Sequence, residues 1–184
     1  MGNKYAVSIG GCMSIEWAEL FDIKAFSEAN PQGFTGFEKV SDLGNACANV
    51  PKEAGVYMIL LPGEIEQPAF CVPGKGARAN KIKPQSIEEL ENRWVPGTRI
   101  VYIGKAGGPK YKTTLKARLQ AYMRFGNNIK AAHRGGRSIW QLENIDDCLV
   151  VWRVAPEDPK GCESCLLKKF KAIYKKLPFA NRQG

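Results

Sequence analysis

The chain has 184 residues, a formal net charge of +9 and 44% hydrophobic residues. This length suits one domain with a modest extension, and the hydrophobic content excludes a chain that is disordered overall. No run approaches the roughly 18 consecutive apolar residues of a membrane span. Residues 1–98 hold 9 Lys/Arg against 12 Asp/Glu, whereas residues 99–184 hold 18 against 6. This asymmetry indicates that the second half meets a polyanion, although a solvated surface kept soluble by charge explains it equally well.

The cysteines and the N-terminus indicate a reducing compartment. The six cysteines are scattered, and only Cys162 and Cys165 are closely spaced. The apolar run 5–13 is too short and too rich in glycine for a secretory signal. We therefore expect a cytoplasmic protein with neither a disulfide framework nor structural zinc.

The first fifty residues predict a helical extension that packs on the remainder of the chain. Ser14 is a candidate cap for a helix over 13–29, and a Gly/Pro/Asn-rich passage follows. A second short helix is expected within 37–49, stopped by Pro51. We therefore place a domain boundary near residue 50, with the main domain over 51–184.

Three apolar runs predict strands. The runs are 55–61, 99–104 and 148–154, and each is closed by turn residues or by a glycine. Residues 63–97 between the first two runs are polar and read as an insertion with one short helix. Residues 127–146 are expected to be irregular or partly helical.

Two further helices are expected on either side of the third strand. Thr113 or Thr114 can cap a helix that runs through Phe125. Asp158 followed by Pro159 is a strong start for the last helix, because an aspartate caps and a proline suits the first helical position. Strands and helices in this order predict an α/β (α+β) domain with a small sheet.

Two features of these helices are unusual. Glu163 precedes Leu166, Leu167 and Phe170 at helical spacing, so it lies on the apolar stripe of the last helix. A carboxylate there is costly unless a cation or several donors hold it, although proximity to the helix N-terminus also favours an acidic residue. Arg118 and Tyr122, four residues apart, share one face of the preceding helix.

Taken in chain order, several residues carry a family resemblance. Gly55-Val-Tyr57, then Tyr102-Ile-Gly-Lys-Ala106, then Arg118 resemble the motifs of the GIY-YIG nuclease family. Glu163 and Asn181 match the metal-binding glutamate and the late asparagine of that family. The resemblance covers about residues 54–182. It implies a three-stranded antiparallel sheet flanked by helices and metal-dependent hydrolysis of phosphodiester bonds, generally in DNA.

The resemblance also implies a role for each matching residue. Tyr102 is expected to be the base, supported by a hydrogen bond from Tyr57, while Lys105 and Arg118 lower the cost of its phenolate. Arg118 is also expected to stabilise the charge of the transition state. The remaining expectations are that Glu163 binds one Mg²⁺ or Mn²⁺, that Tyr122 orients the water, and that Asn181 ties the C-terminal segment to the site.

Lys105 and several basic residues outside this set are expected to contact double-stranded DNA. His133 is the only histidine, which excludes Ser-His-Asp and two-histidine metal mechanisms, and no Gly-Lys-Ser/Thr motif of an NTPase occurs. The flexible segment 133–137 is a candidate phosphate clamp. The residues expected to contact nucleic acid are Lys105, Lys110, Lys112, Arg134 and Arg137.

The pattern departs from the family in several respects and leaves other functions open. The N-terminal extension of about 50 residues has no counterpart in the minimal module, and residues 127–146 align poorly with it. The two tyrosine half-motifs usually lie close together, but Tyr57 and Tyr102 are 45 residues apart here. A nucleic-acid-binding module that keeps the fold without cleaving is the principal alternative, and a protein-interaction domain is a third. Whether the chain forms a homodimer, and whether it cuts DNA or RNA, also stays open.

Overall fold

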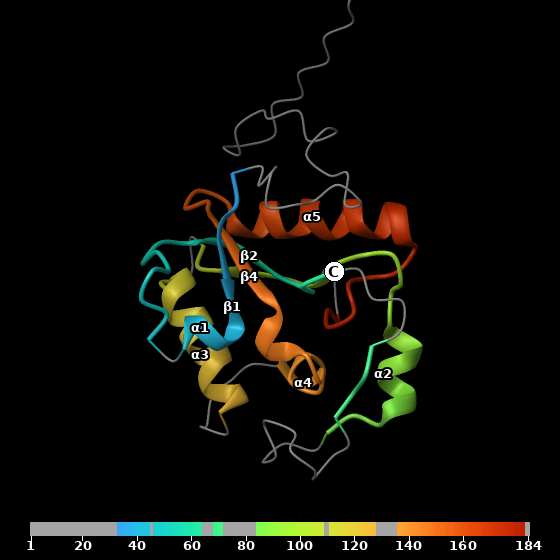
Figure 1. Ribbon diagram of the computed structural model, residues 1–184. Helices are drawn as coiled ribbons and strands as arrows, with labels where there is room; N and C mark the ends of the chain where they lie inside the picture. Colours follow the sequence, from blue (N-terminus) through green and yellow to red (C-terminus); the bar gives the residue numbers. More distant parts are fainter. Residues whose placement is uncertain are drawn as a thin grey trace, which may run out of the picture.

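The computed structural model describes residues 33–44, 46–63, 68–71, 84–108, 111–127 and 136–182. Within these ranges the chain forms a four-stranded antiparallel sheet and five α-helices (Figure 1). None of the helices in the described ranges is long and apolar enough to cross a membrane. The elements in order are β1 (Thr35–Lys39), α1 (Val40–Leu43), β2 (Gly55–Leu60), α2 (Ile87–Arg93), β3 (Ile100–Ala106), α3 (Leu115–Gly126), α4 (Gly136–Ile139), a 3-10 helix (Ile145–Asp147), β4 (Leu149–Val154) and α5 (Pro159–Tyr174).

The sheet has the strand order β1-β4-β2-β3, so β3 lies at one side of the sheet and β1 at the other. The three strands predicted from apolar runs are β2, β3 and β4, and the first two pair directly with each other. The insertion 63–97 therefore leaves and re-enters between adjacent antiparallel strands. It includes α2, whose start is fixed by a capping box between Ser86 and Glu89.

The expectation of three strands is wrong, because β1 adds a fourth from residues assigned to the N-terminal extension. Residues 35–39 pair with β4, and only the single turn α1 is helical within the expected helix 37–49. A register shift between Gly36 and Glu38 interrupts the pairing, and Gly36 and Phe37 both have positive φ angles. The expected helix 13–29 lies outside the described residues.

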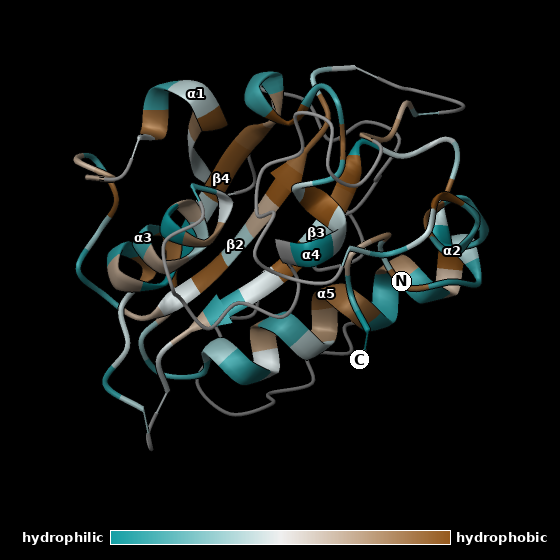
Figure 2. Cartoon of the chain, turned by 90° about the horizontal axis from the view of Figure 1, so that it is seen from below, coloured by the Kyte–Doolittle hydropathy of each residue, from teal (hydrophilic) through white to brown (hydrophobic). Residues whose placement is uncertain are grey.

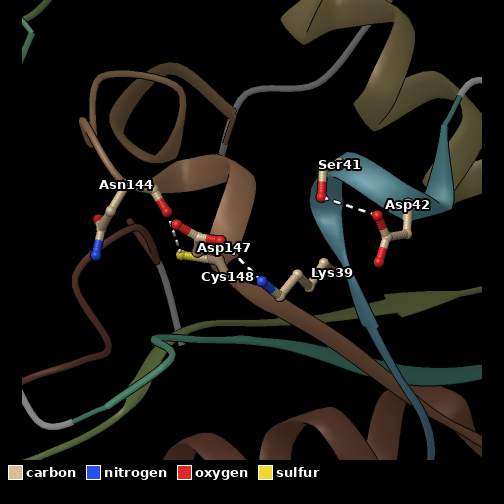
Figure 3. Close-up of polar contacts among 6 residues, drawn as sticks. All are labelled: Lys39, Ser41, Asp42, Asn144, Asp147 and Cys148. Carbon is tan, nitrogen blue, oxygen red and sulfur yellow. Dashed lines mark hydrogen bonds and ion pairs between the residues drawn. The ribbon is translucent and has the colours of Figure 1, made fainter.

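Polar contacts join the end of β1 to the residues before β4 (Figure 3). Lys39 forms an ion pair of 3.0 Å with Asp147, and the Val40 amide donates to the Cys148 carbonyl. These contacts make the described part of residues 33–44 continuous with the sheet of the main domain.

The side chains of the sheet form two apolar layers, one on each face. α5 covers one face through Cys162, Leu166, Leu167 and Phe170, and α3 packs on the opposite face (Figure 1). The apolar colour along β2 and β4 in Figure 2 marks strands that are buried on both faces. Both helix starts agree with their predicted caps, since Thr114 accepts from the Ala117 amide and Asp158 accepts from the Gly161 amide.

Candidate active site

Two tyrosines from adjacent strands lie together on the α3 side of the sheet. Tyr57 in β2 is paired across the ladder with Gly104 in β3, two residues after Tyr102. Because side chains alternate along a strand, Tyr102 and Gly104 share the face on which Tyr57 lies. The two phenol rings are tilted at 49° with their centroids 5.8 Å apart.

Gly104 provides the space for this pair of rings. A Cβ atom at this position would lie 2.7 Å from ring carbons of both Tyr57 and Tyr102. Both rings are buried, so neither has an open direction in which to move aside. The glycine is therefore a steric requirement of the tyrosine pair.

The two tyrosines differ in their access to solvent and in their hydrogen bonding. Tyr57 is fully buried, whereas Tyr102 is 8% exposed, so only Tyr102 can meet water or a bound molecule. Burial raises the pKa of both phenols above the ordinary value of 10. A side-chain hydrogen bond between them lowers the pKa of Tyr102 and raises that of Tyr57.

Arg118 in α3 joins both tyrosines. Burial lowers the pKa of its guanidinium, but interactions and hydrogen bonds with Tyr57 and Tyr102 raise it above the ordinary value overall. Its charge in turn lowers the pKa of both phenols, although burial outweighs this effect. The buried Nε of Arg118 has no hydrogen-bond partner among the described residues, which leaves one donor unused.

The expected effect of nearby cations on Tyr102 is only partly present. Arg118 does favour its phenolate, but Lys105 is not among the charges that shift the pKa of Tyr102. By strand alternation Lys105 lies on the α5 side of β3, opposite Tyr102. The net pKa of Tyr102 is raised, so its phenol is protonated at neutral pH.

Glu163, the fifth residue of α5, brings a carboxylate to this group. Burial raises its pKa, and the charges of Lys105 and Arg118 lower it in part. Glu163 also raises the pKa of Tyr102, so it interacts with residues from both faces of β3. The Glu163 side chain is half-buried. Its carboxylate forms no hydrogen bond or ion pair with any described residue.

Asn181 fastens the C-terminal segment to β3 beside Tyr102. Its side-chain oxygen accepts from the Ile103 amide at 2.9 Å, and its side-chain nitrogen donates to the Ile103 carbonyl at 2.7 Å. The Ala180 amide adds a bond of 2.9 Å to the Val101 carbonyl. Asn181 therefore acts on the backbone that carries Tyr102.

Arg93 at the end of α2 supports this fastening, and sequence reasoning did not single it out. Its Nη2 donates to the Phe179 carbonyl at 2.7 Å and to the Asn181 carbonyl at 3.4 Å, and its Nη1 donates to the Ser138 hydroxyl. Trp94 and Phe179 pack edge to face with their centroids 5.3 Å apart. An arginine directly before a tryptophan, in an otherwise polar insertion, is a weak signal that only the fold makes meaningful.

The remaining candidate residues lie behind the tyrosine pair in the core, on the surface, or outside the described residues. Tyr122 is fully buried against Trp140, with ring centroids 4.9 Å apart. Its hydroxyl therefore faces the core beside the tyrosine pair and has no contact with solvent. Lys112 and Arg137 are exposed, and neither contributes to the pKa shifts described above. Lys110, His133 and Arg134 lie outside the described residues.

The structure thus brings together five of the predicted site residues, which we call the tyrosine–glutamate cluster. They come from β2, β3, α3 and α5, and the first and last are 106 positions apart in the sequence. Within the described residues no group of three or more His, Cys, Asp or Glu side chains is placed to hold a metal ion. The cluster comprises Tyr57, Tyr102, Lys105, Arg118 and Glu163.

Comparisons with protein-family models, with curated proteins and with solved structures find no match to this chain.

Proposed function

We propose that the chain is a metal-dependent endonuclease of the GIY-YIG type that hydrolyses phosphodiester bonds in double-stranded DNA. The observation that carries the proposal is the tyrosine–glutamate cluster. Two phenols, a guanidinium and a carboxylate are gathered there from four elements. Ordinary packing does not require a half-buried arginine in contact with two buried tyrosines beside a half-buried glutamate, because each of these groups loses hydration on burial.

Tyr102 suits the role of base because it is the phenol with solvent access. The Tyr57 hydroxyl donates to its oxygen and so stabilises the phenolate once the proton has left. The contact between these two phenols supports the roles that the resemblance implies for them. The proton of the attacking water passes to the Tyr102 oxygen in this scheme.

Arg118 suits the stabilisation of a phosphate. Its guanidinium is held by the two phenols, and its Nε has no described partner. A positioned cation with an unused donor favours the additional negative charge that develops on phosphate oxygens during hydrolysis.

Glu163 fits a hard divalent cation. Its pKa is raised by burial, and no described residue forms an ion pair with it, so a bound cation would relieve the cost of its charge. Mg²⁺ or Mn²⁺ held by this single carboxylate, with water and phosphate oxygens as the other ligands, would supply Lewis-acid stabilisation of the leaving oxygen.

The basic second half of the chain supports DNA as the partner. Four of the five cluster residues lie in residues 99–184, where 18 Lys/Arg face 6 Asp/Glu. A cytoplasmic location and a homodimer remain predictions of this proposal.

Supercoiled plasmid with Mg²⁺ provides the test. Removing the base in Tyr102→Phe is expected to lower the cutting rate by about 10²–10⁴-fold. Glu163→Gln removes the metal ligand and is expected to lower the rate to a similar degree. Tyr111→Phe and Glu143→Gln are matched controls, because both side chains are exposed and outside the cluster. Full activity in Glu163→Gln, or no nicking by the wild type on any DNA form with Mg²⁺ or Mn²⁺, would overturn the proposal.

The raised pKa of Tyr102 favours a second candidate, a nucleic-acid-binding module that does not cleave. A phenol that stays protonated at neutral pH is a poor base. This candidate predicts salt-sensitive binding of DNA, no metal-dependent cutting, and unchanged binding by Tyr102→Phe.

A further inference from the structure

The outer face of α5 carries a row of lysines. Lys160, Lys168, Lys171 and Lys175 are all exposed. At 100° per residue Lys160, Lys168 and Lys171 fall within an arc of about 80°, beside the arc of the buried residues, and Lys175 follows as the C-cap of the helix. We call these four residues the α5 lysine row.

The charges of this row are not balanced within the described residues. The ion pair found there joins Lys39 to Asp147, and no lysine of the row takes part in one. Glu163, the one acidic residue of α5, faces the sheet side. The row therefore presents positive charge alone to solvent.

Lys160 also opposes the local preference of a helix. It is the second residue of α5, where the partial positive charge of the helix N-terminus disfavours a cation by about 0.3–1 kcal/mol. The Asp158 carboxylate that caps this helix end, with Glu157 before it, offsets part of this cost.

The shape of the helix selects the kind of polyanion. Most apolar residues of α5 pack on the sheet, and Ile173 is its one exposed large hydrophobic side chain, so the helix has no continuous apolar face to insert into a lipid surface. The row spans fifteen residues, or about 22 Å, which matches about six phosphates of one strand along a duplex axis.

We propose that the α5 lysine row binds the phosphate backbone of a DNA duplex along the exposed side of α5. Lys160 lies one turn from Glu163, so the row leads away from the tyrosine–glutamate cluster along the same helix. The row contacts phosphates remote from the one that is hydrolysed. The inference rests on the proposed function for its choice of DNA, and its contribution is to affinity rather than to chemistry.

Salt dependence of binding tests the proposal. A labelled 30-bp duplex is titrated with Glu163→Gln protein in EDTA between 50 and 300 mM KCl, with and without Lys160→Gln, Lys168→Gln and Lys171→Gln together. Lys175 is left in place because its ammonium caps the end of α5 at the Ala172 carbonyl. Each phosphate contact adds about 0.9 to the slope of log K against log salt, so the triple variant is expected to reduce the slope by about 2.7.

The matched control removes two exposed charges across the sheet, in Lys52→Gln and Arg124→Gln, and is compared with the double variant Lys168→Gln and Lys171→Gln. Lys116 is left in place because it donates to the Ala48 carbonyl. An unchanged slope in the α5 triple variant, or an equal reduction in the control, overturns the inference. If the triple variant melts at a lower temperature than its parent, the single variants Lys168→Gln and Lys171→Gln are measured in its place. Each is expected to reduce the salt slope by about 0.9.

Plasmid cutting by the wild type separates this inference from the proposed function. If the wild type cuts plasmid and the triple variant binds with an unchanged salt slope, the proposed endonuclease stands and the inference about the lysine row is refuted. If the triple variant binds with a reduced salt slope and the wild type does not cut, the lysine row stands as a DNA-binding surface and the proposed endonuclease is refuted. Absence of duplex binding at the lowest salt concentration overturns the row whatever the cutting assay reports.

Discussion

Replacing Gly104 with alanine tests whether the tyrosine pair depends on the space that this glycine leaves. The added methyl carbon would lie 2.7 Å from ring carbons of Tyr57 and Tyr102 and 2.8 Å from the Tyr57 oxygen. Ordinary carbon contacts begin near 3.5 Å, so the rings or the strand must move by about 0.8 Å. Both rings belong to a packed core, where such overpacking costs about 1–3 kcal/mol.

The same displacement is expected to affect stability and activity by different amounts. For a chain of this size each kcal/mol lowers the melting temperature by about 2–4 °C, so Gly104→Ala should melt about 2–12 °C below the wild type. A protein of ordinary stability stays almost fully folded after such a loss. A shift of about 1 Å in a catalytic group costs on the order of 10²-fold in rate, so cutting should fall far more than the folded fraction does.

Scanning calorimetry and initial rates of plasmid nicking measure the two effects, and Gly63→Ala is the control. No atom lies within 4 Å of a Cβ built at Gly63, so this variant should melt and cut like the wild type. Wild-type melting and wild-type cutting by Gly104→Ala would refute the steric argument. A lower melting temperature with unchanged cutting by the folded protein would keep the packing argument and refute the role of the tyrosine pair in the reaction.

Three other predictions follow from the site. Because burial raises the pKa of Tyr102 above 10, the rate of cutting should rise about tenfold per pH unit between pH 7 and 9, and a plateau in initial rates below pH 8 would contradict a tyrosine base. The pKa of Glu163 is higher in the folded than in the unfolded state, so ionisation of this carboxyl destabilises the fold as the pH rises from the unfolded value of 4.5 through the higher folded value. Glu163→Gln should therefore melt at a higher temperature than the wild type at pH 7 and at the same temperature at pH 3.5. A lower melting temperature of the variant at pH 7 would count against this. Arg93→Met should cost about 2–3 kcal/mol in urea unfolding and speed amide hydrogen exchange at Ile103, because the carbonyls that Arg93 holds lose a charged donor; unchanged exchange at Ile103 would disconnect Arg93 from β3.

The strands and helices that could be predicted are those with a strong local signal. β2, β3 and β4 are continuous apolar runs because both faces of the sheet are covered. β1 could not be predicted in this way, since residues 35–39 contain a glycine, two charged residues and a bulge. It is a strand because β4 offers it a ladder, which is a tertiary cause that no short window contains.

The site divides in the same manner. Tyr57, Tyr102, Arg118 and Glu163 could be named from motif order and from the misfit of a glutamate on an apolar stripe. The net direction of the Tyr102 pKa could not, because the sequence shows the neighbouring cations but not the burial that outweighs them. Arg93 was missed because its partners are backbone carbonyls 86 and 88 residues away.

The bonds from Ala180 and Asn181 to β3 have a consequence for the solubility of the protein. An outermost strand as apolar as β3 is a template on which another chain can add a strand and begin to aggregate. The C-terminal segment occupies backbone groups of Val101 and Ile103 and so blocks this template. A chain truncated before residue 178 should therefore self-associate even where its core remains folded. An affinity tag is better added before β1 than put in place of residues 178–182.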